Sequence, residues 1–382
     1  MKSKVLLLKA EKHPVNDSLN LLPNQIYKNT HVQIEEQYLG ELDANSIRVK
    51  MLYVGICGSD YHLMKTNPET GYIETSVPVS IPDTGRVIGH EGVGQILDVG
   101  TNVHHLKSGM YVTFESIVVC NHCDVCKRGD FNQCRNAQLI GLETDGIMGE
   151  IVDINANLAH NVTEYISSDN DLKAMACIEP VGVAYDACEN ARVGAGDIVV
   201  VFGGGPIGAY CAILSKYIFG VSRVYVVEPS SFRRNLVSKW ADAVYDSLQS
   251  LRDSIEAVDV IIEASGDLTN VSGIFNSIDA NGRVVLLARS GENLTINSID
   301  HMITNNITIV GSRGHLCGAF RKILRLYNSG KLPLLEIVTK VVDGLDNLAN
   351  ELQSENIVDN DCKVLANICD VFCKGEKTNE LF

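Results

Sequence analysis

The sequence predicts an α/β protein of two domains, in which a β-rich domain precedes a doubly wound parallel sheet. Its 382 residues exceed the roughly 250 to 300 that one hydrophobic core usually serves. The first half is rich in short extended segments broken by turns, whereas from about Cys177 apolar runs alternate with helical patterns. This alternation is typical of parallel strands covered by helices on both faces. We therefore expect one domain at 1–176, completed by 315–382, and the parallel sheet at 177–314.

The composition limits the partners that this chain can have. Hydrophobic residues make up 45% of the chain and charged residues 21%, which is typical of a globular protein with a sizeable core. A formal charge of -15 and a pI near 5.1 disfavour nucleic acid and anionic membranes, because both are negatively charged. Neither a membrane-length apolar run nor an export signal is expected. We expect a cytoplasmic protein with small-molecule substrates, whose 12 cysteines are reduced thiols and metal ligands.

Extended segments mark the β-rich domain. Residues 47–54 alternate polar and apolar side chains before Gly55, as a half-buried strand should. Val87 and Ile88 lead into a glycine cluster at 89, 92 and 94. After Gly311, a helical pattern at 320–326 and a mixed segment indicate that the chain returns to pack on this domain. The polar tail, 369–382, is expected to be frayed.

Five apolar runs indicate the strands of the parallel sheet, at 198–202, 224–227, 260–262, 284–287 and 307–310. The first run leads directly into GGGPIG at 203–208, a G-x-G-x-x-G turn in which Pro206 falls where a helix would begin. Glycines permit this tight turn, and a helix N-terminus offers free N–H groups to a pyrophosphate. Strand, turn and helix together predict a dinucleotide site.

An acidic residue after the second strand indicates which dinucleotide binds. Glu228 follows Gly208 by twenty residues, where a carboxylate can accept both ribose hydroxyls of NAD and repel the extra phosphate of NADP. A solvated strand end is the alternative for Glu228. Arg233 and Arg234 complicate the assignment, since nearby arginines can accept a 2′-phosphate. We expect NAD, with the contacts made by Gly203, Gly205, Pro206, Ile207, Gly208, Glu228 and Arg233.

Four cysteines predict a structural zinc site. Cys120, Cys123, Cys126 and Cys134 have the spacing C-x2-C-x2-C-x7-C, which can close a tetrahedron around one Zn2+ in a compact loop. Such a site leaves no position open for a substrate. The alternatives are four unrelated buried cysteines or an iron–sulfur cluster, which also takes four thiolates but usually in a different spacing.

A second zinc site is indicated by residues that precede this loop. Cys57 lies at a glycine-flanked bend, and His90 is followed by the carboxylate of Glu91. A thiolate, an imidazole and a carboxylate leave the fourth position of zinc open, as a Lewis acid needs in order to bind an alcohol or carbonyl oxygen. A single Cys or His is more often packed than catalytic. Their occurrence beside a complete four-thiolate set favours the metal site.

In chain order, GICGSDYH, GHEGVGQILDVG, the four-cysteine motif, Ile178-Glu179-Pro180-Val181 and GGGPIG resemble the zinc-dependent medium-chain alcohol dehydrogenases. Within them the chain is most similar to the polyol, sugar and threonine dehydrogenase branch. The resemblance covers about 46–366. It implies a GroES-like catalytic domain, a Rossmann cofactor domain, two zinc ions per chain, NAD, and a homodimer or homotetramer.

The resemblance also implies roles for particular residues. Cys57 and His90 would be catalytic zinc ligands, and the third protein contact would be Glu179, as ligand or water-holder, with Glu91 as the alternate. Asp60 would orient His90, as metal-bound histidines generally require. Ser59 occupies the place of a proton-relaying hydroxyl, and His62 could carry that proton toward solvent. A plain turn residue and a surface histidine are the respective alternatives.

Several positions depart from that family's pattern. The segments 11–30 and 65–86 are longer or richer in turns, and 144–151 lacks the usual aromatic residue. Ser116 replaces a bulky apolar pocket wall and suits a polar substrate. Arg313 is expected near the nicotinamide, where it contacts the cofactor or an acidic substrate group, or forms a domain-interface salt bridge.

The sequence thus predicts a zinc dehydrogenase that transfers hydride between NAD and a secondary alcohol of a polyol, sugar, cyclitol or amino alcohol. A threonine-like amino-alcohol dehydrogenase is one alternative. A non-catalytic redox sensor that binds zinc and nucleotide is the other.

Overall fold

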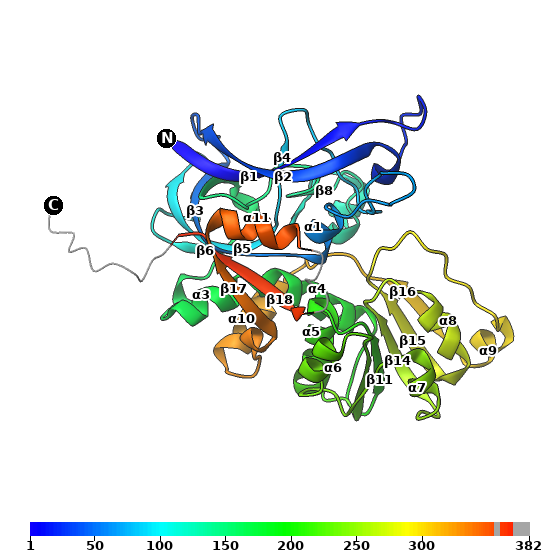
Figure 1. Cartoon of the computed structure of the whole chain (residues 1–382). Coiled ribbons are helices and arrows are strands. Elements are labelled where there is room, and N and C mark those ends of the chain that lie inside the picture. Colours follow the sequence, from blue (N-terminus) through cyan, green and yellow to red (C-terminus); the bar gives the residue numbers. More distant parts are fainter. Residues whose placement is uncertain (355–359, 370–382) are drawn as a thin grey trace.

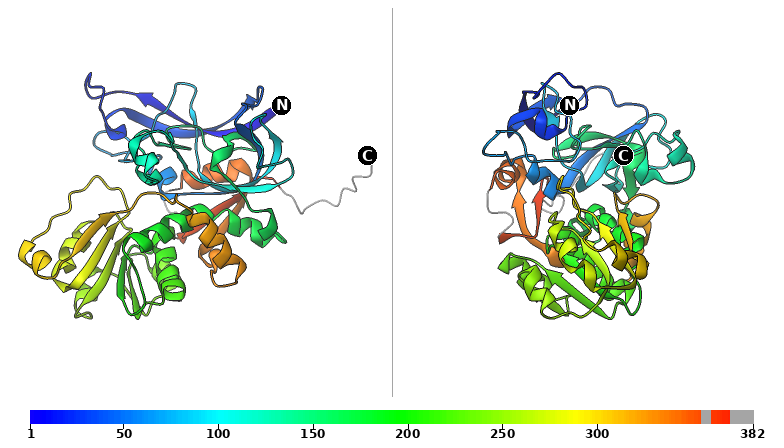
Figure 2. Two further views of the ribbon diagram at one scale, coloured as in Figure 1. Left: turned by 180° about the vertical axis from the view of Figure 1, so that it is seen from behind. Right: turned by 90° about the vertical axis from the view of Figure 1, so that its right-hand side faces the viewer.

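The computed structural model describes residues 1–354 and 360–369, and it divides into two lobes (Figure 1). The β-rich lobe holds the N-terminus and fills the upper part of the view, while the parallel sheet lies at the lower right. Views from behind and from the side show the same division (Figure 2). The predicted boundaries at 176/177 and 314/315 remain predictions.

Two antiparallel strands begin the β-rich lobe. β1 (Lys2–Lys12) pairs with β2 (Tyr27–Tyr38), and β1 also pairs with the short β4 (Arg86–Val87). The segment 11–30, expected as an insertion, therefore forms the distal end of this hairpin. Leu6 and Leu8 on β1 pack into the core of the lobe, so the hairpin is a structural part of it.

A larger sheet positions Cys57, His90 and Glu91, which lie at or beside the ends of its strands. Its strands run in the order β10-β6-β5-β3-β18-β17, and β9 also pairs with β3. β18 pairs antiparallel with β3, placing Leu365 opposite Gly55. The last described strands therefore lie in the same sheet as β3. The strands are β3 (Ser46–Gly55), β5 (Glu91–Val99), β6 (Tyr111–Phe114), β9 (Ile151–Asn155), β10 (Ala159–Asn161), β17 (Val338–Asp343) and β18 (Lys363–Asn367).

The second lobe is a six-stranded parallel sheet in the order β13-β12-β11-β14-β15-β16. In chain order this is 3-2-1-4-5-6, the doubly wound order of dinucleotide-binding domains. The sequence predicted five of these strands and missed β13, which is only three residues long. The strands are β11 (Ile198–Phe202), β12 (Arg223–Val227), β13 (Ala243–Tyr245), β14 (Val258–Glu263), β15 (Ile278–Leu286) and β16 (Thr308–Gly311).

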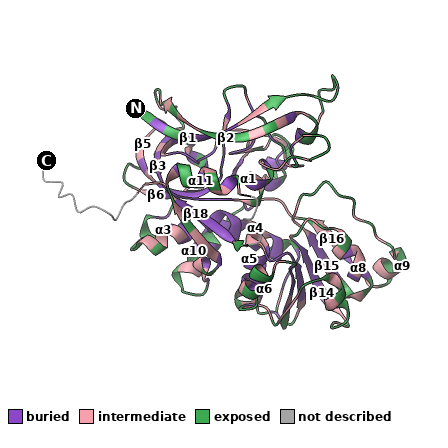
Figure 3. Cartoon of the chain, in the orientation of Figure 1, coloured by how far each residue is buried: buried purple, intermediate pink, exposed green. Residues whose placement is uncertain are grey.

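Alternate residues of β11 serve two different cores, as expected for a strand covered on both faces. Val199 and Val201 belong to a cluster that includes residues of two helices, α4 (Ile178–Asn190) and α5 (Pro206–Leu214). Val200 and Phe202 pack in a second cluster with residues of α7 (Leu248–Arg252) and α8 (Thr269–Ile274). The central strand is therefore buried from Val199 to Phe202, like much of the parallel sheet (Figure 3).

The remaining elements connect or cover these sheets. α10 lies at the position of the helix predicted at 320–326, whereas nearly all of the tail predicted to fray lies outside the described residues. Within the described part, no helix is long and apolar enough to cross a membrane. The elements are α1 (Gly58–His62), α2 (Asp124–Lys127), α3 (Asp169–Met175), α6 (Ser231–Val237), α9 (Ile299–Thr304), α10 (Ala319–Asn328), α11 (Gly344–Leu352), β7 (Ile117–Val118) and β8 (Gln138–Leu139).

Candidate active site and metal centres

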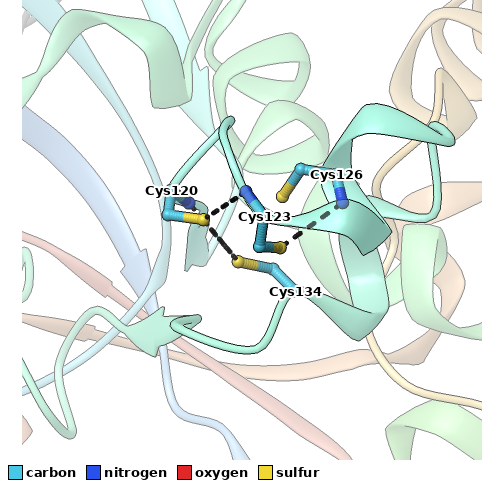
Figure 4. Close-up of side chains that lie close together, drawn as sticks. All are labelled: Cys120, Cys123, Cys126 and Cys134. Carbon is cyan, nitrogen blue, oxygen red and sulfur yellow. Dashed lines mark hydrogen bonds between the residues drawn. The ribbon is translucent and has the colours of Figure 1, made fainter.

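The four cysteines of the predicted structural site converge within one loop (Figure 4). Their sulfur atoms all lie within 4.8 Å of one another. The backbone N–H of Cys123 donates to the Cys120 thiol at 3.4 Å, and that of Cys126 donates to the Cys123 thiol at 3.5 Å. We call residues 120–134 the four-cysteine lobe.

Backbone donors and burial act in opposite directions on the thiols of this lobe. The N–H groups of His122 and Cys123 lower the pKa of Cys120 to about 5, whereas burial raises the pKa of Cys126 to about 12. A thiol with so high a pKa becomes a thiolate only when a cation binds. The number, type and convergence of the donors fit a tetrahedral zinc site.

A second group of candidate ligands gathers where β3 and β5 lie side by side. Cys57 follows β3, and His90 and Glu91 lie at the start of β5; their ligand atoms are within 4.8 Å of one another. We call these three residues the Cys57 cluster. Loss of water around Cys57 and the nearby Asp60 raise the pKa of its thiol to about 11. A thiol, an imidazole and a carboxylate in one group fit zinc. Bound zinc would favour the thiolate form of Cys57 and so counteract the rise in its pKa.

Asp60 lies beside the imidazole that it was predicted to orient. Its Oδ2 accepts a hydrogen bond from the Cys57 backbone N–H at 3.0 Å, and its Oδ1 is 3.9 Å from His90 Nδ1. Both Oδ1 and Nδ1 are buried without a hydrogen-bond partner among the described residues. A small rotation would join these two unpaired atoms, and the other imidazole nitrogen would then be free for a metal.

One residue of this centre, Lys363, was not predicted. Its Nζ donates to Glu91 Oε2 and to the Ile56 carbonyl oxygen, the latter at 2.8 Å. The side chain is 0% exposed, and burial lowers its pKa to about 8. Lys363 begins β18 and is more than 270 residues from Glu91, so local spacing could not identify the pair.

Glu179, the favoured third ligand, lies near the Cys57 cluster but has partners of its own. Its Oε1 accepts from Ser116 Oγ at 2.8 Å and is 3.0 Å from His315 Nε2. Burial opposes ionisation of Glu179, but His315 and then His90 outweigh it, so the pKa of Glu179 is lowered. The hydroxyl of Ser116, predicted to contact the substrate, is thus engaged by Glu179. The sequence analysis missed His315, which is fully buried.

The two residues of the predicted proton relay lie on α1. Ser59 Oγ is buried and has no hydrogen-bond partner among the described residues. His62 ends the helix and is exposed; desolvation and Lys65 lower its pKa. The structure therefore offers an unpaired hydroxyl near Cys57 and a histidine at the surface.

The glycine-rich turn connects β11 to α5 as predicted. Gly203 has φ +95°, and a Cβ on Gly208 would lie 1.9 Å from the Gly203 carbonyl oxygen. Only glycine fits both positions without moving the backbone. Pro206 begins α5, Ile207 follows it, and Gly205 is the N-cap. This turn can therefore present backbone N–H groups to a pyrophosphate.

Glu228 lies directly against this turn and is only 6% exposed. Its Oε2 accepts from the Gly204 N–H and its Oε1 from the Ser230 N–H, both at 2.7 Å. The solvated strand end considered as an alternative does not describe this buried carboxylate. Arg233 Nε donates to the Asp361 carbonyl oxygen at 3.0 Å. A Cβ on Gly205 would lie 3.5 Å from the Arg233 guanidinium. The Glu228 carboxylate and the Arg233 guanidinium therefore both lie next to this turn.

A parallel-sheet nucleotide lobe, a four-thiolate loop and an open thiolate–imidazole–carboxylate cluster define a zinc-containing oxidoreductase. The alcohol dehydrogenase GroES-like domain family matches residues 43–164, and the zinc-binding dehydrogenase family matches 206–329. L-threonine 3-dehydrogenase of Pyrococcus furiosus is 31% identical over 310 residues, covering 78% of this chain and 85% of the relative. Scyllo-inosose 3-dehydrogenase of Thermotoga maritima is 29% identical over 86% of this chain and 88% of the relative.

A solved structure supports the same relationship. One from Thermotoga maritima, provisionally described as an alcohol dehydrogenase, superposes with a TM-score of 0.85 at 26% identity and covers 96% of this chain and 100% of that one. The chain belongs to the zinc-dependent medium-chain alcohol dehydrogenases, in their polyol and threonine dehydrogenase branch. It is an alcohol oxidoreductase that uses zinc and a nicotinamide cofactor.

Proposed function

We propose that this chain oxidises a secondary alcohol of a polyol, sugar, cyclitol or amino alcohol with NAD, and catalyses the reverse reduction. The observation that carries this proposal is the Cys57 cluster, a three-ligand set with the unpaired Ser59 hydroxyl close by. Three protein ligands are the pattern of catalytic zinc, because the fourth position takes the substrate. Relatives named for threonine, xylulose and inosose reactions also act on secondary alcohols or their ketones.

We propose two zinc ions per chain, one in the four-cysteine lobe and one in the Cys57 cluster. The geometry favours Glu91, the alternate in the sequence prediction, as the third protein ligand, because its carboxylate lies within 4.8 Å of the other donors. Glu179, held by Ser116 and His315, is proposed to act through a water molecule. Zinc loss in Glu91→Gln with retention in Glu179→Gln supports this division, and the opposite pattern refutes it.

The chain's own residues supply the proton path and the orientation of the reactants. Zinc, when bound, polarises the substrate oxygen and so makes the hydroxyl acidic, and NAD accepts the hydride. Ser59 is placed to take the hydroxyl proton, because its Oγ is buried and unpaired. His62 passes the proton to solvent, since the imidazole is exposed. Asp60 would orient His90 once a small rotation brings its Oδ1, now 3.9 Å away, within hydrogen-bond distance of His90 Nδ1.

We propose NAD over NADP because the Glu228 carboxylate lies where it could accept hydrogen bonds from both ribose hydroxyls of NAD. This buried carboxylate sits against the glycine turn and would repel a 2′-phosphate. Arg233, beside Gly205, is the competing feature. Glu228→Ala should weaken the preference for NAD, so that kcat/KM with NAD divided by kcat/KM with NADP falls. A wild-type enzyme that prefers NADP would assign the choice to Arg233 instead.

The experiment that tests the activity is a substrate panel with both cofactors. We expect polyols, cyclitols and amino alcohols to be oxidised more efficiently than ethanol, because buried polar side chains penalise a ligand that cannot pair with them. Threonine is included because relatives carry that name. A preference for simple primary alcohols would refute the polyol assignment. Absence of turnover in zinc-replete protein would favour a non-catalytic sensor.

We also propose a cytoplasmic homodimer or homotetramer. β16 is an edge strand of the parallel sheet, and two isoleucines of the neighbouring α9, Ile299 and Ile303, are 54% and 72% exposed. An unpaired edge beside exposed apolar residues favours self-association. Light scattering of the purified chain tests this: a monomer at micromolar concentration would contradict it.

A further inference from the structure

Two arginines follow neighbouring strands at the nucleotide-binding edge of the parallel sheet. β15 and β16 are parallel, with Leu286 opposite Gly311. Arg289 comes three residues after Leu286, and Arg313 comes two residues after Gly311. Because parallel strands end at the same edge, both arginines leave the sheet on the side where the glycine turn leaves β11.

The position of these strands separates the arginines from the pyrophosphate site. In the sheet order, β15 lies two strands and β16 three strands away from β11. At a strand spacing of about 4.8 Å, that is roughly 10 to 14 Å from the glycine turn. A dinucleotide whose ribose contacts Glu228, on the opposite side of β11, would have its nicotinamide end toward β15 and β16. The arginines therefore belong to the reacting end of the cleft.

Contacts with the β-rich lobe place the Arg313 segment beside the metal cluster. A Cβ on Gly314 would lie 2.4 Å from Ile117 Cδ1, so the backbone here touches that lobe directly. His315, two residues after Arg313, lies 3.0 Å from Glu179. The Arg289 segment is also close to this lobe, since a Cβ on Gly291 would lie 3.8 Å from Ser76 Cβ.

Neither guanidinium is neutralised by a carboxylate in the described part of the chain. No ion pair is formed by Arg289 or Arg313 there, so the domain-interface salt bridge considered from the sequence is not found. Arg313 Nε is buried and has no hydrogen-bond partner among the described residues. Burial, and then the positive charge of Arg313, lower the pKa of Arg289, in keeping with the adjacent positions of the two strands that they follow.

Among the described residues, the carboxylate of Glu143 acts on Arg289. It raises the pKa of Arg289 from across the lobe boundary but does not come within ion-pair distance. Its Oε2 accepts from the Leu139 N–H at 3.0 Å, so it is held by its own loop. In the free protein, the guanidinium groups of Arg289 and Arg313 repel each other, and the buried Arg313 Nε lacks an acceptor. A bound anion would reduce the repulsion and accept that hydrogen bond.

We propose that Arg289 and Arg313 bind an anionic group of the substrate, so that the enzyme acts on a polyol or sugar that carries a carboxylate or a phosphate. This inference rests on the proposed function and narrows its substrate class. Guanidinium groups match carboxylate and phosphate oxygens with paired hydrogen bonds. A local cationic pair is also what a chain of net charge -15 needs in order to attract an anionic substrate.

Matched substrate pairs test the proposal. Glucitol is compared with glucitol 6-phosphate and with gluconate, using wild type, Arg289→Gln, Arg313→Gln and the double variant. Arg321→Gln is the control, because Arg321 is exposed on α10. We expect wild type to prefer at least one anionic partner, and the double variant to lose roughly 10- to 100-fold in kcat/KM for it. Neutral glucitol should change little.

The two anionic substrates distinguish the group that is recognised, because gluconate carries a carboxylate and glucitol 6-phosphate a phosphate. A wild-type preference for neutral glucitol over both anions would overturn the proposal. So would an equal loss for glucitol and the anions in the arginine variants, since that indicates general damage.

A binding measurement separates this inference from the proposed activity. Calorimetry with gluconate and with glucitol 6-phosphate, in the presence of NADH, reports the anion site whether or not turnover occurs. Loss of binding in the double variant but not in Arg321→Gln supports the site even if the enzyme is inactive toward every alcohol. Equal binding by wild type and the double variant, or no binding by wild type, overturns it.

Discussion

The four-cysteine lobe and the Cys57 cluster are built in opposite ways. The lobe draws its ligands from one segment of fifteen residues, 120–134, and backbone N–H groups support its thiols. The Cys57 cluster draws its ligands from the segments at the end of β3 and the start of β5, and side chains from distant parts of the chain surround it. Lys363 bonds Glu91, and Asp60 lies beside His90. A site that only binds metal can be local, whereas a reactive site needs charges whose positions the whole fold sets.

The pKa shifts in the two sites have partly different causes. In the lobe, backbone N–H groups lower the pKa of Cys120 to about 5, whereas burial raises that of Cys126 to about 12. In the cluster, desolvation raises the pKa of Cys57 to about 11 and lowers that of Lys363 to about 8. Burial makes each charge in the cluster depend on its partner. Substitutions should therefore affect stability in the lobe and chemistry in the cluster.

Cys57→Ala should have the largest effect on turnover. It removes a charged ligand from the cluster, so we expect activity to fall below detection, while NADH still binds at the separate glycine turn. Steady-state kinetics and NADH fluorescence measure the two functions. Cys317→Ser is the matched control, because Cys317 is an exposed thiol outside both ligand sets, and serine can keep its hydrogen bond to the Gly129 carbonyl oxygen. Full activity in Cys57→Ala would show that the cluster is not catalytic.

Cys123→Ser should act on stability. Loss of a lobe ligand should lower Tm by roughly 5 °C or more, since 1 kcal/mol corresponds to about 2 to 4 °C in a domain of this size. The folded fraction should keep its cluster metal, because the two ligand sets share no residue. Calorimetry and activity per folded molecule check both statements. An unchanged Tm together with lost activity would reverse the roles that we assign.

Ser59→Ala should lower kcat by on the order of 10²- to 10⁴-fold, the usual contribution of a positioned proton-transfer group. Zinc content and NADH affinity should be unchanged, because Ser59 is not among the metal donors. Ser59→Thr keeps the hydroxyl and serves as the control. Equal activity in the Ala and Thr variants would show that the Ser59 hydroxyl transfers no proton and that Ser59 is only a turn residue.

His315→Leu should lower kcat/KM by roughly 10- to 100-fold, as loss of a supporting hydrogen bond near a metal typically does. The substitution removes the imidazole nitrogen that lies 3.0 Å from Glu179 Oε1. Zinc should stay bound. His315→Gln can still donate to Glu179 and should retain most activity. If both variants lose the same activity, His315 contributes packing against Phe320 and does not position Glu179.

The sequence predicted what is local and missed what is distant. The four-cysteine motif, the glycine turn and the apolar strands depend on neighbouring residues, and the structure has each of them at the predicted place. The three-residue β13 was missed because it is too short to have a period. Lys363 and His315 could not be found, since their partners lie far away in the chain. Ser116 was predicted to face the substrate, but its partner Glu179 could be known only from the fold.

If the two centres hold separate zinc ions with separate roles, each ion should be lost independently of the other, which metal analysis can measure. Zinc is counted per chain by mass spectrometry in wild type, Cys57→Ala and Cys123→Ser, each purified without chelators. We predict two zinc ions in wild type and one in each variant, with the remaining zinc located in the intact centre. One zinc in wild type, iron in place of zinc, or loss of both ions through a single substitution would contradict the account.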